Sequence, residues 1–291
     1  MKLSLLHIKF FLLITAISFS ASAQMPNSDI YLFTIKRTGS TMIVKKGENI
    51  TKREGYDNQP FFTPDNKSLL FVSIKSDLQA DVYSYNLGNQ KTTPVTQTPV
   101  SEYSPIVTPD GKFFTAVVVE QDSTQRIYKY DLKNKLKPEL LFDEDSVGYY
   151  SWLNKDSVLY YKLTAPHSLH AYDIKNKRDV WIANSPTRSF KPVKNFSFFY
   201  CTQDKNESMV RIYNMRLKKS EEYVAVKKEN EDFIWDKTLG LIKSDGSKIM
   251  RYNDDIKTWV EMADFSAFGV GKITRFAFSP NGRYLAVVGN K

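Results

Sequence analysis

The sequence predicts an all-β protein: a six-bladed β-propeller of four-stranded blades, closed by pairing its N-terminal strands with its C-terminal strands. Two observations carry this prediction. One apolar or aromatic residue recurs about every 43 residues, two positions before a turn proline or its equivalent. Each interval also holds two hairpin patterns, hence four strands, which is the content of one propeller blade. The recurring residue falls at Phe62, Val107, Trp152, Val193, Trp235 and Phe278.

The first 23 residues are predicted to be a cleaved signal peptide. Lys2 and Lys9 lie before an apolar run at residues 10–17, and small residues follow as far as Ala23. This order is typical of secretory signals, and the run is shorter than the roughly 20 residues that cross a bilayer. An uncleaved membrane anchor is the alternative. Cleavage leaves residues 24–291 as a single propeller domain, periplasmic or secreted, with no further membrane span.

Composition narrows the class of partner. The formal net charge is +9, but the lysines fall mainly in predicted turns and alternate with acidic residues. We interpret this charge as a solvated surface and expect no nucleic-acid partner. The 17 tyrosines and 19 phenylalanines suit half-buried strands. The single cysteine, Cys201, excludes an internal disulfide and is interpreted as a small buried residue.

The first hairpin of each repeat is clearest around residues 108–112, Thr-Pro-Asp-Gly-Lys. Related turns occupy residues 63–67 and 279–283. Proline sets φ for a turn, aspartate accepts hydrogen bonds from nearby amides, and glycine takes positive φ without strain. We therefore interpret Asp110 as a turn former and not as a catalytic acid. The strand leaving the turn, as at residues 113–119, is rich in β-branched and aromatic residues.

The second hairpin begins with a strand in which apolar and polar residues alternate, as at residues 81–87 and 126–132. The sixth copy contains only its first hairpin. Residues 30–35 and 42–45 near the N-terminus match a second hairpin in kind. Pairing these strands with the last copy would close the ring and leave no free blade edge at the seam.

Residues 95–112 and 276–286 resemble the repeats of TolB-like β-propellers, a family of WD40-like (PD40) repeats. The Asp-Ile-Tyr start of residues 29–31 resembles their outer strands. The resemblance covers the mature chain and implies the six-bladed architecture, whereas a fold does not define a function. About five residues separate Gln24 from the first predicted strand, which leaves no room for the α/β domain found in that family. We therefore carry over neither its transport partners nor the activity of propeller-bearing peptidases.

We predict a binding site at one mouth of the central channel, where the loops leading into the innermost strands meet. Its mixture of aromatic, basic and polar residues suits a protein or peptide of the cell envelope. The leading hypothesis is a monomeric, non-catalytic binding module without a cofactor. The alternatives are a propeller enzyme of lactonase or lyase type with a channel metal, and a carbohydrate or cell-surface binding protein. The predicted site residues are Tyr56, Asn58, Glu102, Tyr103, Tyr149, Arg188, Phe190, Asp232 and Arg275.

Patterns that indicate catalysis are weak, and no catalytic or metal-binding residue is predicted. His167 and His170 are the only histidines after the signal, and their spacing puts them on opposite faces of a strand. No cysteine or carboxylate cluster stands beside them, as a metal site would require. Residues 244–247, Ser-Asp-Gly-Ser, resemble part of a sialidase Asp-box but fit a hairpin turn better.

Overall fold

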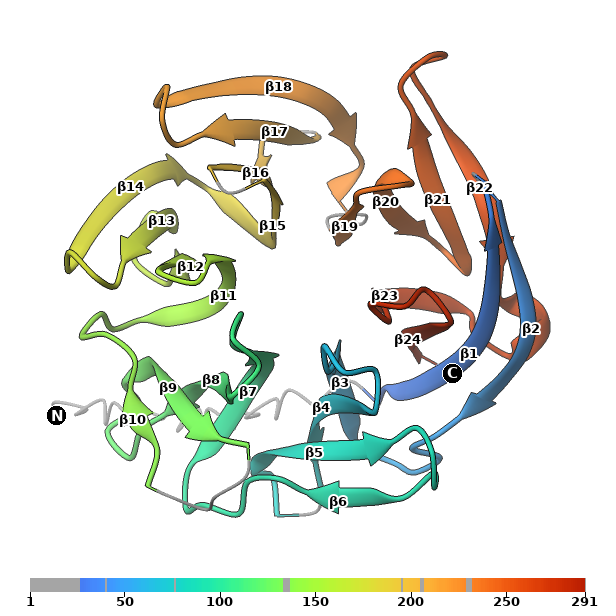
Figure 1. Cartoon of the computed structure of the whole chain (residues 1–291), viewed down its shortest axis with the longest axis horizontal. Coiled ribbons are helices and arrows are strands. Elements are labelled where there is room, and N and C mark those ends of the chain that lie inside the picture. Colours follow the sequence, from blue (N-terminus) through green and yellow to red (C-terminus); the bar gives the residue numbers. More distant parts are fainter. Residues whose placement is uncertain are drawn as a thin grey trace, which may run out of the picture.

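The computed structural model describes residues 27–39, 41–75, 77–132, 137–194, 196–204, 207–228 and 232–290. The predicted signal peptide lies outside these residues. Within them, twenty-four strands form six antiparallel sheets of four strands, set in a ring around a central channel (Figure 1). The prediction of a six-bladed propeller is thereby confirmed. In the described part of the chain, no helix has both the length and the apolar character needed to traverse a bilayer.

The blades are numbered 1 to 6 in the order in which the chain forms their innermost strands. Blade 1 comprises β3 (Tyr56–Phe62), β4 (Ser68–Ile74), β5 (Ala80–Asn86) and β6 (Thr92–Pro94). Blade 2 comprises β7 (Ser101–Val107), β8 (Phe113–Val119), β9 (Gln125–Asp131) and β10 (Glu139–Leu140). Blade 3 comprises β11 (Val147–Asn154), β12 (Ser157–Lys162), β13 (Ser168–Asp173) and β14 (Arg178–Asn184).

Blade 4 comprises β15 (Pro186–Lys194), β16 (Ser197–Gln203), β17 (Ser208–Asn214) and β18 (Lys219–Val226). Blade 5 comprises β19 (Phe233–Asp236), β20 (Gly240–Asp245), β21 (Lys248–Asn253) and β22 (Thr258–Asp264), followed by the 3-10 turn η2 (Ser266–Phe268). Blade 6 comprises β23 (Lys272–Phe278), β24 (Tyr284–Asn290), β1 (Asp29–Thr38) and β2 (Thr41–Asn49).

Blade 6 closes the ring as predicted, because it combines strands from both ends of the chain. Its order is β2-β1-β24-β23, and Tyr31 of β1 lies opposite Val287 of β24. Arg37 of β1 reaches the neighbouring blade, where its Nη1 lies 2.6 Å from Oδ2 of Asp236. The same guanidinium stacks over the ring of Phe278 at 4.1 Å. The closure therefore adds an ion pair to the strand pairing.

The turn residues behave as their chemistry predicts. Thr108 donates from Oγ1 to Oδ1 of Asp110 at 2.6 Å, and the backbone N–H of Lys112 donates to the same oxygen at 3.1 Å. The hydrogen bond from Thr108 contributes most to holding the pKa of Asp110 below its usual range. Asp110 is thus occupied in shaping the turn.

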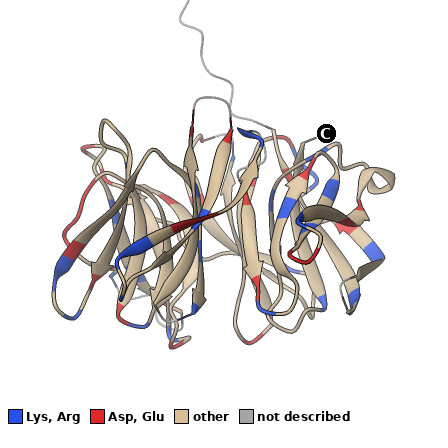
Figure 2. Ribbon diagram, turned by 90° about the horizontal axis from the view of Figure 1, so that it is seen from above, with Lys and Arg blue, Asp and Glu red and all other residues tan. Residues whose placement is uncertain are grey.

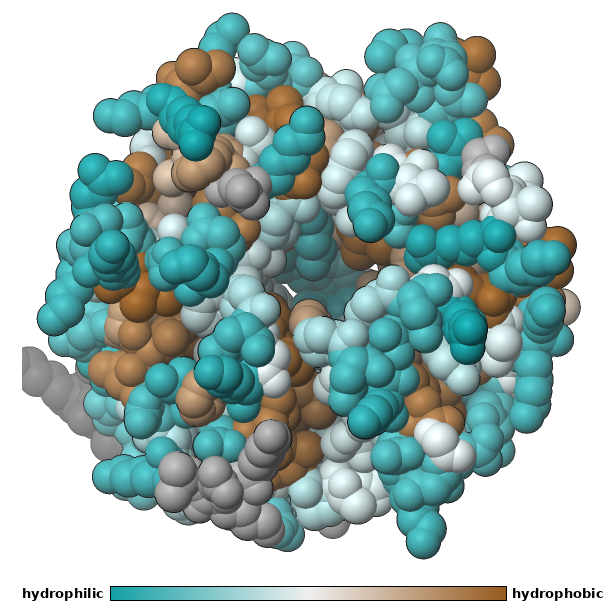
Figure 3. All heavy atoms as spheres, in the orientation of Figure 1, coloured by the Kyte–Doolittle hydropathy of each residue, from teal (hydrophilic) through white to brown (hydrophobic). Residues whose placement is uncertain are grey.

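Apolar side chains fill the spaces between neighbouring blades. One cluster joins Ile30 and Leu32 of blade 6 to Phe62, Leu69 and Phe71 of blade 1. Cys201 is fully buried in another cluster between blades 4 and 5, as predicted. Basic and acidic residues are both distributed around the ring, without one face of a single sign (Figure 2). The face shown in Figure 3 is hollowed at its centre, where the innermost strands surround the channel.

Candidate functional site

The innermost strands are irregular where they line the channel. Register shifts interrupt the pairing of β3, β7, β11, β15 and β23 with their neighbours. Gln59 of β3 and Ser104 of β7 take positive φ angles of 58° and 54°. Such irregularities bend a strand and change the direction of a side chain. The channel wall is therefore built from side chains that a regular strand would direct elsewhere.

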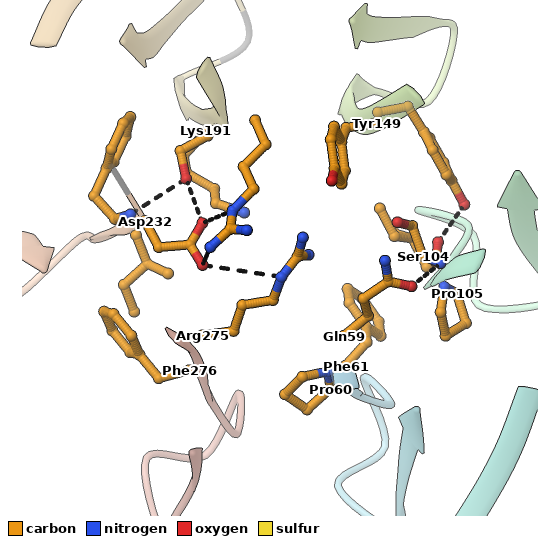
Figure 4. Close-up of a pocket in the computed structure, with 16 residues that line it drawn as sticks. Gln59, Pro60, Phe61, Ser104, Pro105, Tyr149, Lys191, Asp232, Arg275 and Phe276 are labelled. Carbon is orange, nitrogen blue, oxygen red and sulfur yellow. Dashed lines mark hydrogen bonds and ion pairs between the residues drawn. The ribbon is translucent and has the colours of Figure 1, made fainter. Parts of the chain in front are cut away.

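A cavity of about 120 Å³ lies inside the channel (Figure 4). Five blades each contribute to it the residue that stands three positions before the recurring apolar residue of the repeat. These residues are Gln59, Ser104, Tyr149, Asp232 and Arg275. In blade 4 the equivalent residue is Phe190, which is only 2% exposed and packs in the core. A register shift between Pro186 and Phe190 gives the cavity Arg188, Ser189 and Lys191 instead.

Asp232 is the centre of a hydrogen-bonded cluster in this cavity. Arg188 donates from Nε to Oδ1 at 3.1 Å and from Nη2 to Oδ2 at 3.0 Å. Ser189 donates from Oγ to Oδ1 at 3.0 Å, and Nε of Arg275 lies 4.0 Å from Oδ2. Burial raises the pKa of the Asp232 carboxyl, but the charges of Arg188 and Arg275 outweigh burial and bring the pKa below its usual range. Asp232 is therefore held as a carboxylate.

Two arginines and a lysine surround this one carboxylate. Arg188 also donates from Nη2 to the backbone oxygen of Thr274 at 3.0 Å, and the Arg275 guanidinium lies 5.3 Å from the centre of the Tyr149 ring. Burial lowers the pKa of the Lys191 ammonium; the two arginines lower it further, and Asp232 opposes them. The cluster of Arg188, Lys191, Asp232 and Arg275, called the basic cluster below, thus has an excess of positive charge.

Tyrosines occupy the part of the channel beside the basic cluster. Tyr56, Tyr103 and Tyr149 line an adjoining cavity of about 320 Å³, together with Gln59. Burial raises the pKa of the Tyr56 phenol, which the positive charge of Arg275 partly offsets. Burial likewise raises the pKa of Tyr103. Gln59 and Tyr149 line both cavities, so the aromatic and basic surfaces are continuous.

The structure brings six of the nine predicted site residues together around the channel. Tyr149, Arg188, Asp232 and Arg275 line the central cavity, and Tyr56 and Tyr103 line the adjoining one. Asn58 lines neither of these cavities: it is largely buried, and its Oδ1 accepts the backbone N–H of Gln59 at 2.7 Å.

The positions predicted for Glu102 and Phe190 need correction, because both side chains are buried away from the channel, and Phe190 packs between blades 3 and 4. Glu102 is 0% exposed and accepts hydrogen bonds from Thr98 and from the phenol of Tyr130 at 3.3 Å. Side chains alternate between the faces of a strand, which sets Glu102 opposite to its neighbour Tyr103. Phe190 is displaced by the irregular register of β15.

Sequence reasoning missed Gln59, Ser104 and Lys191 of the central cavity. A signal for the first two was available, because both stand three positions before the recurring apolar residue. Lys191 had no comparable signal, since the pairing irregularity of β15 that exposes it has no counterpart in the repeat spacing.

Blade 3 contains a further polar network that the sequence did not reveal. Oγ of Ser168 lies 2.9 Å from Nε2 of His170, whose Nδ1 lies 2.6 Å from Oδ2 of Asp179. The order of groups is that of a serine hydrolase triad. Ser168 is only 6% exposed, however, and Tyr160 also donates to Asp179 at 3.0 Å. We interpret the network as partly exposed hydrogen bonding that ties strands β12, β13 and β14 together.

Among the described residues, no group of three or more His, Cys, Asp or Glu side chains is placed to hold a metal ion. Neither a protein-family model nor a curated protein sequence matches this chain. Solved structures do match it. A putative TolB from Agrobacterium tumefaciens has a TM-score of 0.68 at 13% identity, over 91% of this chain and 98% of that chain.

TolB from Acinetobacter baumannii has a TM-score of 0.52 at 17% identity, over 66% of this chain and 52% of that chain. This chain therefore spans about half the length of that TolB. An oligogalacturonate lyase in complex with manganese has a TM-score of 0.58 at 12% identity, over 86% and 83% of the two chains. At these identities the likeness establishes the fold alone, which is that of a TolB-like six-bladed propeller.

Proposed function

We propose that the protein is an exported, non-catalytic binding module that holds a protein or peptide of the cell envelope at the mouth of its central channel. The observation that carries this proposal is the continuous surface formed by Tyr56, Tyr103 and Tyr149 beside the basic cluster. Tyrosine and arginine are the residues that contribute most often to binding hot spots, because both offer large contact area with directed hydrogen bonds.

The rigidity of the wall supports a binding role. Tyr149, Asp232 and Arg275 are held by three different blades, and the interactions among them tie the blades together. A ligand entering this channel would meet side chains already in place, so little ordering would oppose its binding. Pre-formed sites of this kind suit the recognition of a peptide or of a loop from a folded protein.

A metal-dependent propeller enzyme of lyase or lactonase type is the second candidate, because the fold is shared with a lyase that was solved with manganese. Such an enzyme would need ligands that converge on one ion. Among the described residues that line the central cavity, Asp232 is the one acidic side chain, and it is engaged by Arg188 and Ser189. A carbohydrate-binding role through the tyrosines is the third candidate.

The test is a triple substitution at the channel, Tyr103→Ala, Tyr149→Ala and Arg275→Ala. Partners captured by the immobilised wild-type protein from envelope extracts would be identified by mass spectrometry, purified and titrated against both proteins. We expect the triple variant to lose at least about 2 kcal/mol of binding free energy. Unchanged affinity would contradict the channel as the site.

A matched control removes aromatic and basic groups elsewhere. Trp181 lies exposed on β14, and Arg216 lies in the exposed turn between β17 and β18. The double variant Trp181→Ala, Arg216→Ala should bind the partner as tightly as wild type does. Thermal unfolding of all variants would establish that the ring remains intact.

Export is a separate part of the proposal with its own measurement. Cleavage after Ala23 would make Gln24 the first residue of the mature protein. Mass spectrometry of the N-terminal peptide of the protein recovered from the periplasm or medium should show this start. A chain that retains residues 1–23 and stays with the membrane fraction would contradict it.

A further inference from the structure

We propose that the basic cluster recognises the C-terminal carboxylate of a peptide whose last side chain is apolar. This inference rests on the proposed peptide-binding function and specifies the group that is bound. Among the described residues of the cavity wall, Arg275, Lys191 and Gln59 present hydrogen-bond donors to the central space.

Arg275 supplies the first of these donors. Among the described residues its guanidinium makes only a 4.0 Å ion pair with Asp232 and a stacking contact with Tyr149, and it makes no hydrogen bond at ordinary distance. In Figure 4 it points into the open space between Asp232 and Tyr149. A guanidinium is planar and presents two parallel N–H groups, the geometry that a carboxylate accepts.

Lys191 and Gln59 supply further donors around the same space. Within the described chain, no ion pair engages the Lys191 ammonium, which lies near Asp232 and Arg275. Oε1 of Gln59 accepts the backbone N–H of Ser104 at 2.6 Å. The Gln59 side-chain nitrogen is therefore the atom left to face the cavity, as Figure 4 shows. An anion seated between Arg275, Lys191 and Gln59 would satisfy all three.

The net charge of the cavity also favours a carboxylate as the ligand. Asp232 balances only one of the two arginines, and Arg188 takes both of its oxygens. A ligand with a single negative charge would bring the cavity closer to neutrality. Because the side chains of Arg275 and Asp232 are only 18% and 16% exposed, this interaction is stronger than it would be at an open surface.

The remaining walls favour a peptide end over an acidic sugar. Pro60, Phe61, Pro105 and Phe276 line the cavity opposite and beside the donors, and Ile106 is also part of its wall. These side chains would desolvate the hydroxyl groups of a sugar without offering hydrogen bonds in return. An apolar last side chain would instead bury its surface against them. A cavity of about 120 Å³ also suits one carboxylate with its adjoining atoms better than a long polyanion.

The experiment titrates the full mature protein with four defined probes by isothermal calorimetry at low ionic strength. The probes are N-acetyl-Ala-Ala-Phe with a free C-terminus, the same peptide as its C-terminal amide, an N-acetyl-Ala-Glu-Phe amide, and a galacturonate trimer. We expect the free acid to bind about tenfold to a hundredfold more tightly than its amide, because a charge-assisted hydrogen bond is lost in the amide.

The variant Arg275→Gln should weaken binding of the free acid by a similar factor and leave binding of the amide unchanged. Arg216→Gln removes an equal charge from the exposed turn between β17 and β18 and serves as the matched control. It should leave all four affinities unchanged. This pattern couples one residue to one functional group of the ligand, which general loss of structure would not do.

Several results would overturn the inference. Equal affinity for the free acid and its amide would show that the carboxylate is not recognised, and the channel would remain a peptide site. Equal affinity for the free acid and the internal glutamate peptide would assign the cluster to an acidic side chain instead. Tighter binding of the galacturonate trimer would favour a sugar acid, and no binding by any probe at millimolar concentration would reject this specificity. The triple variant described above tests peptide binding separately.

Discussion

Asp232 and Glu102 are both acidic residues at the start of innermost strands, β19 and β7, and both were expected at the mouth of the channel. The structure gives them opposite environments. Asp232 has two arginines and a lysine around it. Glu102 accepts hydrogen bonds from Thr98 and Tyr130, and its Oε2 has no partner among the described residues.

The difference lies in the neighbouring charges and not in burial. Burial raises the pKa of both carboxyl groups. The arginines reverse this effect at Asp232, whereas hydrogen bonds from neutral groups do not reverse it at Glu102, whose pKa stays above its usual range. Asp232 thereby links Arg188 of blade 4 and Arg275 of blade 6 through blade 5. Glu102 lies within blade 2 and opposes folding when it is ionised.

The largest effect is expected at Asp232. The variant Asp232→Asn would leave Arg188 and Arg275 without a counter-charge and should lower the free energy of unfolding by about 2–3 kcal/mol. The figure is below that of a fully enclosed pair because the Arg188 side chain is 36% exposed. Urea unfolding at pH 7 would measure it, and added sodium sulfate should restore part of the loss. A variant as stable as wild type would show that the cations do not need Asp232.

The pH dependence of the stability that Asp232 contributes follows from the direction of its pKa shift. The folded pKa of Asp232 lies below the unfolded value of about 3.9. Its contribution should be complete above that pH and decline as the pH falls through the folded pKa. The stability difference between Asp232→Asn and wild type should therefore shrink only in acid.

Glu102 should give a smaller effect of opposite sign. The variant Glu102→Gln removes a buried charge that has no cation beside it, and should raise the free energy of unfolding by on the order of 1 kcal/mol at pH 8. The folded pKa of Glu102 is raised, so its unfavourable contribution is absent below the unfolded value of about 4.3 and grows as the pH rises through the folded pKa.

Chemical unfolding from pH 4 to pH 8 would test this prediction. The gain from Glu102→Gln should appear with rising pH and vanish near pH 4. A destabilised variant at pH 8 would mean that the ionised carboxylate supports blade 2, and it would end the contrast with Asp232. Leu132, exposed directly after β9, offers a control position beside the same blade through Leu132→Gln.

The same pair of residues indicates how far the sequence could predict this protein. The ring, its closure and the turn role of Asp110 follow from period and turn chemistry, which are local properties. The channel wall could be predicted only in part, because Gln59 and Ser104 reach the cavity through bulges that redirect single side chains. The contrast between Asp232 and Glu102 could not be predicted, since Arg188 and Arg275 lie 44 and 43 positions from Asp232 and meet it only when the ring closes.

Asp57 is the intermediate case and should give the smallest change. It stands five positions before its recurring apolar residue, as Glu102 does, and its side chain is likewise fully buried. Unlike Glu102 it has a cation, because Nη2 of Arg53 lies 2.6 Å from its Oδ1, while its Oδ2 has no partner in the described chain. Burial raises its pKa, and the bonds to Ser73 and Arg53 do not fully offset that effect.

The variant Asp57→Asn should thus change the free energy of unfolding at pH 7 by no more than about 0.5 kcal/mol. Relief of the buried charge and loss of the ion pair nearly cancel, and Arg53 can turn to solvent because part of it is exposed. Unfolding in urea beside Asp232→Asn and Glu102→Gln would rank the three carboxylates. A loss of about 2 kcal/mol or more would place Asp57 with Asp232, and one arginine would then suffice to make a buried carboxylate stabilising in this ring.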